Sequence, residues 1–247
     1  MKYILNPCTD PWRNMALDEW MLMNGPDEPV FWLWRNEPSV IIGYNQDAEA
    51  EVNLDYLREH GIKLARRVTG GGAVYHDLQN LNYSFAGPLD SVHPMFFVNA
   101  LSAVGLQATL TGRNDIFFDG RKISGYARRL WKNRELVHGT LMYDVDIETL
   151  TAALDTLASK LHRKGVASVK SRVTNVRDAL PRYPGLDSLQ AALQEFLSRP
   201  GVPARPSPGP ALLHDPETVL TPAQLAEVDA LAAGKFSSPE WLYGRFS

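Results

Sequence analysis

The chain has 247 residues, of which 45% are hydrophobic and 21% charged, and its formal net charge is -3. This length can bury one sizeable core or two unequal ones, and the small negative charge excludes a general attraction for nucleic acid or anionic membranes. The single cysteine, Cys8, excludes an internal disulfide and a cysteine-based zinc site. No window approaches the roughly 20 apolar residues of a membrane span, and no signal-peptide core follows the start. We expect a cytoplasmic protein.

The first half of the chain is expected to alternate between helices and strands. Asp10-Pro11 offers a helix cap followed by proline at the first helical position, and apolar residues then recur from Leu17 at helical spacing. A second helix is predicted over residues 53–60, with Gly61 at its end. Short apolar runs rich in branched and aromatic residues predict strands, with a turn between the first two, at 30–35, 39–43, 62–68, 73–76 and 82–85.

In the second half, Asp119-Gly120 separates two runs typical of strands and is the strongest short signal of a hairpin, which puts Lys122 just past the turn. Another strand is predicted at 136–145. Helices are predicted at 96–104, 147–161, 186–197 and 222–231, and residues 200–210 form a proline-rich connection. Strands in hairpins with helices between them indicate an α+β fold, with a mixed, largely antiparallel sheet packed against helices.

The segment at 66–77 carries the most chemical information. Its three glycines, Gly70 to Gly72, allow the backbone to approach a phosphate or a ring closely, and their amides can point together at an anion. Arg66 and Arg67 add positive charge. The segment lacks both the Gly-Lys-Ser/Thr of a Walker loop and the spacing of a dinucleotide fingerprint. By itself it is equally compatible with a glycine-rich turn between strands.

Three further residues are candidates for a site. A lysine beside a tight hairpin, such as Lys122, is a fixed cation suited to a phosphate or carboxylate oxygen, although most turn lysines are simply exposed. Asp115 could hold a magnesium ion or pair with Arg113. His138 enters a strand, where a histidine is more often structural than a ligand contact.

Together these segments resemble the lipoate-protein ligase A family, part of the biotin and lipoate ligase superfamily. The matching segments follow the order of the family and span residues 10 to 176, which is far more specific than any single motif. They are residues 14–19, 34–40, 43–46, 66–77, 80–85, 112–115, 122–125, 138–141 and 171–175.

The resemblance implies an ATP-dependent ligase that converts lipoate to lipoyl-AMP and transfers the lipoyl group to a lysine of an acceptor domain. The implied acceptors are lipoyl domains of 2-oxoacid dehydrogenase E2 subunits or the H protein of glycine cleavage. Lys122 would be the catalytic residue, touching the lipoyl carboxylate and the α-phosphate. Implied contacts to ATP or lipoyl-AMP come from Arg67, Gly71, Gly72, Ala73, Val74, Tyr75, His76, Asn114, Asp115 and Lys122.

Implied contacts to lipoate come from Lys122, Gly70, His138 and Gly139, and Asp115 would hold Mg²⁺. The apolar lipoyl chain needs a hydrophobic tunnel, for which Trp34, Val40 and Ile41 are candidates, although core packing explains them equally well.

The resemblance also implies a domain organisation. Residues 1–182 would form a catalytic domain like that of biotin and lipoate ligases, and residues 183–247 a helical extension packed on the same domain. Many family members continue into a small accessory domain after a Trp-x-x-Gly-like segment, and such a segment stands at 241–247. We therefore expect no accessory domain here and a separate accessory protein for the activation step.

Three alternatives compete with the ligase. The nearest is a lipoyl or octanoyl transferase that uses preformed lipoyl-AMP or a carrier-bound acyl group. Its cysteine-dependent version needs a nucleophile in the middle of the chain, whereas the cysteine here is Cys8. A biotin ligase is disfavoured because its loop of alternating arginine and glycine is missing, and an inactive lipoate-binding scaffold because Lys122 and the glycine segment are both present.

Overall fold

The computed structural model describes residues 1–112, 114–154, 173–199 and 220–246, which include a seven-stranded and a three-stranded sheet. The larger sheet has the order β1-β2-β6-β10-β9-β8-β7, and only its β1–β2 pairing is parallel. Its strands are β1 (Lys2–Tyr3), β2 (Val30–Trp34), β6 (Asn80–Pro88), β7 (Thr109–Thr111), β8 (Asp115–Phe118), β9 (Arg121–Trp131) and β10 (Arg134–Met142). The predicted α+β class, with a mixed and largely antiparallel sheet, is confirmed.

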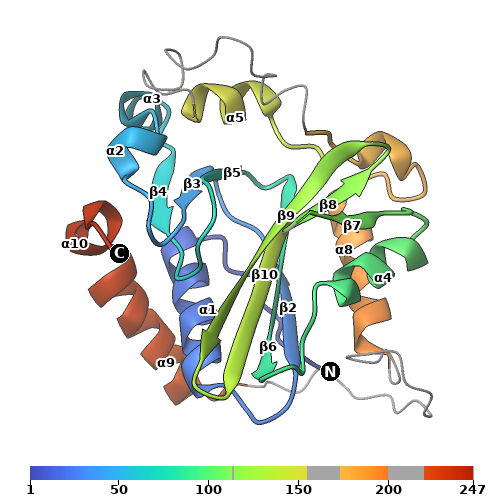
Figure 1. Cartoon of the computed structure of the whole chain (residues 1–247), viewed down its shortest axis with the longest axis horizontal. Helices are drawn as coiled ribbons and strands as arrows, with labels where there is room; N and C mark the ends of the chain where they lie inside the picture. The colour runs from blue at the N-terminus through green and yellow to red at the C-terminus, as the bar shows by residue number, and fades with distance from the viewer. Residues whose placement is uncertain (113, 155–172, 200–219, 247) are drawn as a thin grey trace.

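Helices cover both faces of this sheet (Figure 1). Because side chains alternate along a strand, Phe31 and Leu33 of β2 enter one hydrophobic cluster while Val30 and Trp32 enter another. The first cluster includes α4 (Met95–Ala103) and α8 (Leu186–Ser198), and the second includes α1 (Pro11–Asn24) and α9 (Pro222–Leu231). The central strands are therefore buried on both sides.

Helix α1 forms as predicted. The carboxylate of Asp10 accepts a hydrogen bond from the backbone N–H of Arg13 at 2.9 Å, and Pro11 occupies the first turn, where its missing N–H costs nothing. Leu17, Trp20 and Met21 are buried on the inner face. This helix carries Met15 and Asp18 to the region described below.

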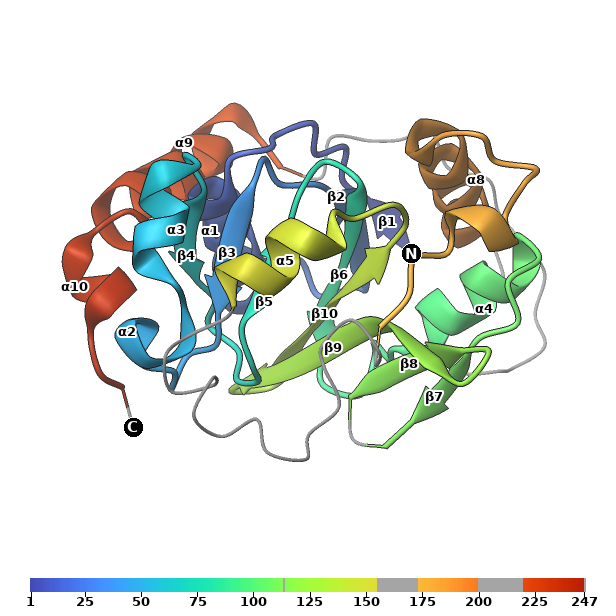
Figure 2. The same cartoon turned by 90° about the horizontal axis from the view of Figure 1, so that it is seen from above.

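The smaller sheet has the order β4-β3-β5 and consists of β3 (Ser39–Ile42), β4 (Lys63–Arg66) and β5 (Val74–His76). Figure 2 shows it beside α2 (Ala48–Glu51) and α3 (Leu54–Glu59), on the side of the molecule away from α4 and α8. The strands predicted at 30–35 and 39–43 both form, but β2 and β3 belong to different sheets and do not pair. Helix α5 (Ile147–Ala153) confirms the first part of the helix predicted to 161. Leu154 already lies in a turn, and residues 155–161 lie outside the described residues.

The Asp-Gly hairpin is confirmed. Asp119 and Gly120 have φ values of 48° and 71°, the left-handed pair that a two-residue turn requires, and they connect β8 to β9. The register of β8 and β9 shifts between Ile116 and Phe117, which leaves Ile123 of β9, next to Lys122, as the extra residue of a bulge. Bulges re-aim side chains, and this one is not evident from the sequence.

The C-terminal segment packs on α1. After α9 come η2 (Ala232–Phe236) and α10 (Pro239–Tyr243), which sequence patterns did not predict, as they did not predict β1, α2, β7 or η1 (Arg177–Ala179). All of these are short, so they carry little periodicity. The proline-rich segment at 200–210 lies outside the described residues. No helix of the described chain is long and apolar enough to cross a membrane.

Candidate active site

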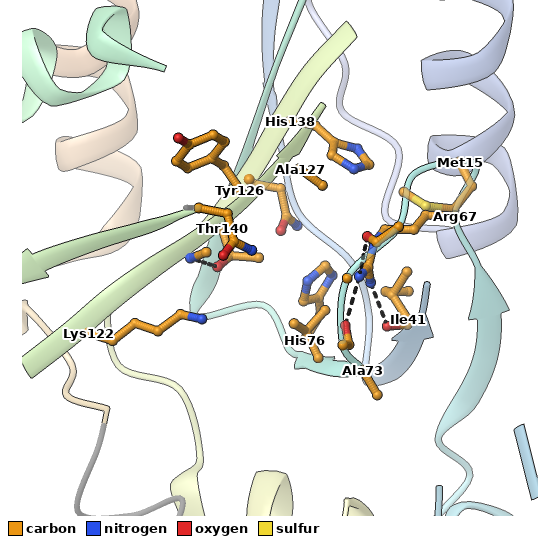
Figure 3. Close-up of a pocket in the computed structure, with 18 of the residues that line it drawn as sticks. Met15, Ile41, Arg67, Ala73, His76, Lys122, Tyr126, Ala127, His138 and Thr140 are labelled. Atoms are coloured by element: carbon orange, nitrogen blue, oxygen red, sulfur yellow. Dashed lines mark hydrogen bonds between the residues drawn. The ribbon is translucent and has the colours of Figure 1, made fainter. Parts of the chain in front are cut away.

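A cavity lies between the two sheets, where the loop after β4 faces β6, β9 and β10 (Figure 3). Its walls come from segments far apart in the sequence, from α1 to β10. The lining residues are Met15, Trp34, Ile41, Arg67, Gly70, Gly71, Gly72, Ala73, Val74, His76, Asn82, Asn114, Lys122, Gly125, Tyr126, Ala127, His138, Gly139 and Thr140.

Most of the candidate site residues meet at this cavity. The exceptions are Tyr75 and Asp115. The ring of Tyr75 is buried in the cluster between the small sheet and α3, because alternate residues of β5 face opposite sides. Asp115 is in contact with Lys122 and does not line the cavity. Of the proposed tunnel residues, Trp34 and Ile41 line the cavity, whereas Val40 is buried in the same cluster as Tyr75.

The glycine loop is organised by Arg67. Its buried guanidinium donates to the carbonyl oxygens of Gly70 (2.9 and 3.1 Å), Gly72 (2.7 Å) and Ile41 (3.0 Å). In a trans peptide the N–H points opposite to the C=O, so the N–H groups of Gly71 and Ala73 point away from Arg67. Burial lowers the pKa of Arg67 to about 10, which leaves it charged at neutral pH. An anion on this loop would meet backbone amides with a positive charge behind them.

The neighbouring Arg66 does not bind the glycine loop with its side chain. It is fully buried and donates to six carbonyl oxygens, three in the turn after β3 and three at the end of α10. Trp241 Nε1 donates back to the carbonyl oxygen of Arg66 at 3.0 Å. Arg66 therefore connects the turn after β3 to the C-terminal helix and does not line the cavity.

Lys122 is held rigidly at the opposite wall. The backbone N–H of Thr174 donates to its carbonyl oxygen at 3.0 Å, and Lys122 forms a parallel bridge with Val173. Its ammonium lies 2.7 Å from Asp115 Oδ1. Figure 3 shows the side chain extending into the cavity toward His76. The arrangement provides a fixed cation that faces the glycine loop across the cavity.

His138 is part of a buried hydrogen-bond network. Its Nδ1 lies 2.5 Å from Asp18 Oδ2, and its Nε2 lies 2.7 Å from Thr69 Oγ1. Ser84 Oγ donates to the other oxygen of Asp18 at 2.8 Å, and Trp34 Nε1 donates to Ser84 Oγ at 3.0 Å. The network fixes the orientation of the imidazole and of the indole, both of which line the cavity.

His76 is buried beside the cavity in its neutral form. Desolvation, followed by the charge of Arg67 and the neighbouring His138, lowers its pKa from 6.5 to about 3. Asn36 Nδ2 lies 3.0 Å from His76 Nδ1. The imidazole can therefore donate and accept hydrogen bonds but does not carry charge near neutral pH.

Several lining residues were not predicted as site residues from the sequence, namely Met15, Asn82, Gly125, Tyr126, Ala127 and Thr140. Most stand within or beside the matched motifs, so strand alternation could have indicated which of them share a face with His138 or Lys122. Met15 is different, because only tertiary packing brings α1 to the cavity.

The described residues contain no cluster of three or more histidine, cysteine, aspartate or glutamate side chains that could hold a metal ion. No residue lining the cavity is acidic. Mg²⁺ commonly binds through one or two carboxylates together with nucleotide phosphates. Asp115, the carboxylate expected to hold Mg²⁺, is paired with Lys122 and lies outside the cavity lining.

The chain is similar to known proteins of one family. Residues 10–198 match the family model described as the lipoyl protein ligase A/B catalytic domain. Lipoate-protein ligase LplJ of Bacillus subtilis is 35% identical over 96% of this chain and 71% of its own length. Lipoate-protein ligase 1 of Staphylococcus aureus is 44% identical over 73% of this chain, but only 58% of that relative is covered.

Solved structures show the same fold. A structure of a bipartite lipoate protein ligase system from Thermoplasma acidophilum, described with its E2 lipoyl domain, has a TM-score of 0.80 at 31% identity and covers 100% of this chain and 97% of its own. A lipoate-protein ligase A bound with ATP has a TM-score of 0.76 at 30% identity, with 99% of both chains covered. With a family model spanning most of its length, the chain belongs to the lipoyl protein ligase A/B catalytic-domain family.

Proposed function

We propose that the chain is a lipoate-protein ligase, which activates lipoate with ATP and transfers the lipoyl group to a lysine of an acceptor lipoyl domain. The observation that carries the proposal is one cavity in which the Lys122 ammonium faces the amides of the glycine loop, with Trp34, Ile41 and Met15 as apolar lining. A ligand with an apolar chain, a carboxylate and a neighbouring phosphate matches this arrangement. Relatives named for this activity and a related structure with ATP bound support it.

In the first step, a carboxylate oxygen of lipoate attacks the α-phosphorus of ATP. A bond forms between the carboxylate oxygen and the α-phosphorus. The bond from the α-phosphorus to the oxygen that it shares with the β-phosphorus breaks, and pyrophosphate leaves with the electron pair. Negative charge gathers at the α-phosphoryl oxygens. Lys122 on one wall and the N–H groups of Gly71 and Ala73 on the other are already in place to stabilise it. Mg²⁺ would neutralise the phosphate oxygens.

Binding of the nucleotide changes the surroundings of Lys122. The Lys122 ammonium is paired with Asp115 at 2.7 Å. A bound phosphate is a second anion, which can compete with Asp115 for this ammonium. The pairing orients the ammonium before substrate arrives. Asp115 would hold the Mg²⁺ that accompanies the phosphates.

In the second step, the neutral amine of the acceptor lysine attacks the acyl carbonyl carbon. An amide bond forms, the bond from the acyl carbon to oxygen breaks, AMP leaves with the electron pair, and the amine loses a proton to solvent. No covalent bond to the enzyme is needed. Lys122, which lies near the carbonyl, stabilises the oxyanion of this step as well.

The acceptor and any accessory protein belong to the same proposal. The relative from T. acidophilum is described as bipartite and together with an E2 lipoyl domain, which supports E2 lipoyl domains as acceptors and a separate accessory protein for activation. The H protein of glycine cleavage is a second acceptor of the same kind. The use of ATP fits a cytoplasmic location.

The test uses the purified chain with ATP, Mg²⁺, lipoate and an acceptor lipoyl domain, with and without an accessory protein. A parallel reaction supplies synthetic lipoyl-AMP in place of ATP and lipoate. Pyrophosphate release together with acceptor modification supports the ligase. If the acceptor is modified only in the reaction that supplies lipoyl-AMP, even with the accessory protein present, the result supports the lipoyl transferase instead. No modification in any reaction refutes both.

The variant Lys122→Ala tests whether the activity depends on this cavity. We expect adenylate formation to fall by at least about 100-fold, because a pre-placed cation at the developing charge is lost. Lys132→Ala is the matched control, since Lys132 lies at the exposed end of the β9–β10 hairpin. Equal activity of the two variants would contradict the site.

A further inference from the structure

Two buried hydrogen-bond donors line the cavity without an acceptor. Within the described residues, no group accepts a hydrogen bond from His76 Nε2 or Asn82 Nδ2. His76 is 3% exposed and Asn82 is 0% exposed, and both line the cavity. Nearly all buried polar groups in native proteins are hydrogen-bonded, so two such donors at one cavity indicate a ligand atom that accepts from them.

The direction of hydrogen bonding at His76 follows from its neighbours. Asn14 Nδ2 donates to the carbonyl oxygens of Cys8 and Arg35, each at 3.1 Å, which identifies the nitrogen of this amide. The same nitrogen donates to Asn36 Oδ1 at 2.8 Å, so Asn36 Nδ2 faces His76 and donates to its Nδ1 at 3.0 Å. Since Nδ1 accepts, the neutral ring carries its proton on Nε2.

Asn82 also presents a hydrogen-bond donor whose orientation is set by a neighbouring side chain. Its Oδ1 accepts a hydrogen bond from Asn80 Nδ2 at 2.8 Å, which leaves the Asn82 amide nitrogen without an acceptor. Asn82 lies on β6 between Trp34 of β2 and Thr140 of β10. The strand is paired on both sides, so the donor is held by a rigid backbone.

The two donors belong to the polar part of the cavity. The ring of His76 meets that of Trp34 edge-on, with centroids 6.1 Å apart, and Trp34 pairs with Asn82 across the sheet. Figure 3 shows His76 between Lys122 and the loop at Ala73. An acyl group whose carboxylate reaches Lys122 while phosphates lie on the loop would therefore place its oxygen beside His76.

We propose that His76 Nε2–H and Asn82 Nδ2–H together bind the carbonyl oxygen of the acyl group and stabilise the oxyanion that forms there during transfer. The inference rests on the proposed function, adds Asn82 to the site and gives His76 a specific role in it. Neutral, pre-oriented donors suit this oxygen, because hydrogen bonds already in place stabilise the negative charge that develops on it. Their orientation is set by Asn36 and Asn80 before the ligand binds.

The test compares two probes by calorimetry. The first is a sulfamoyl analogue of lipoyl-AMP, which has the acyl carbonyl but cannot be hydrolysed, and the second is AMP, which has no acyl group. The variants are Asn82→Leu and His76→Phe, which remove the donors, and His76→Gln, whose amide can restore a donor near the Nε2 position. Ser91→Ala is the control, because the Ser91 hydroxyl is also buried and unpartnered but lies outside the cavity lining.

We expect Asn82→Leu and His76→Phe each to weaken binding of the analogue by about tenfold, with AMP binding unchanged. Retained AMP binding also shows that the variant is folded. The rate constant for transfer from lipoyl-AMP to the acceptor should fall further, by about 100-fold, because the carbonyl oxygen gains charge in the transition state. His76→Gln should recover part of both losses, and Ser91→Ala should match wild type.

Two results would overturn the inference. An equal loss of AMP and analogue binding would assign the donors to the nucleotide. Unchanged analogue binding and transfer in both donor-deleting variants would show that the donors are merely buried. Failure of the wild-type chain to bind the analogue is a different result, since it would refute the proposed function itself.

Discussion

The protonation of His76 should make the stability of the protein depend on pH in a way that one substitution isolates. The pKa of His76 is lowered from 6.5 to about 3 in the folded chain, chiefly by burial. Below pH 6.5 the unfolded chain therefore binds a proton that the folded chain does not bind. The contribution of the neutral His76 to the free energy of unfolding is therefore fully present above pH 6.5 and is lost as the pH falls toward 3.

The magnitude follows from this difference. At about pH 4.5 the imidazole is neutral in the folded state and almost fully protonated in the unfolded state. Between about pH 7.5 and pH 4.5 the free energy of unfolding should fall by about 2.5 kcal/mol because of this residue alone. Because pH 4.5 lies above the folded-state pKa of about 3, the expected difference depends mainly on the ordinary pKa of 6.5.

Urea unfolding of the wild-type chain and of His76→Gln at both pH values measures this contribution. Carboxylates that titrate in the same range affect both proteins and cancel in the comparison. We expect the variant to lose about 2.5 kcal/mol less than wild type on acidification. Equal losses in the two proteins would mean that His76 becomes protonated without unfolding, and would refute the account of its burial.

Three substitutions test other parts of the structure. Gly71→Val should lower ATP affinity at least tenfold, because Gly71 has a φ of 96° and a Cβ there would lie 2.9 Å from Arg67 Nη2, disturbing the loop. Gly139→Ala should destabilise the fold by about 1–3 kcal/mol, since the new Cβ would lie 2.4 Å from Tyr83 Oη between paired strands. Arg66→Lys should cost about 2–4 kcal/mol, because a lysine has three donors for the carbonyl oxygens that Arg66 now binds.

Each substitution has a matched control. Gly61→Val also places a side chain at a positive φ of 63° but in open space, and should leave ATP affinity unchanged. Gly234→Ala has no atom within 4 Å of the new Cβ, and Arg58→Lys changes an exposed arginine, so urea unfolding of both should resemble wild type. A substitution that behaves like its control would contradict the corresponding contact.

Much of the local structure could be predicted from the sequence because its causes are local. The Asp10-Pro11 cap, the helical spacing from Leu17 and the Asp119-Gly120 turn each act over a few residues, and each produced the expected element. The ordered motifs likewise indicated the glycine loop and Lys122, which the fold places on opposite walls of one cavity. Short elements such as β7 and α10 escaped prediction, because a few residues carry no clear period.

The tertiary structure decided which partner each polar group has. Nothing near Arg66 and Arg67 in the sequence shows that the first holds α10, 175 residues away, while the second braces the glycine loop. The pairing of Asp18 with His138 spans 120 residues, and the donors of His76 and Asn82 are recognisable only once their neighbours are known. Residue types and spacings thus determined which chemical groups the chain carries. Hydrogen-bond partners and burial, which arise from contacts distant in sequence, determined which of those groups remain available to a ligand.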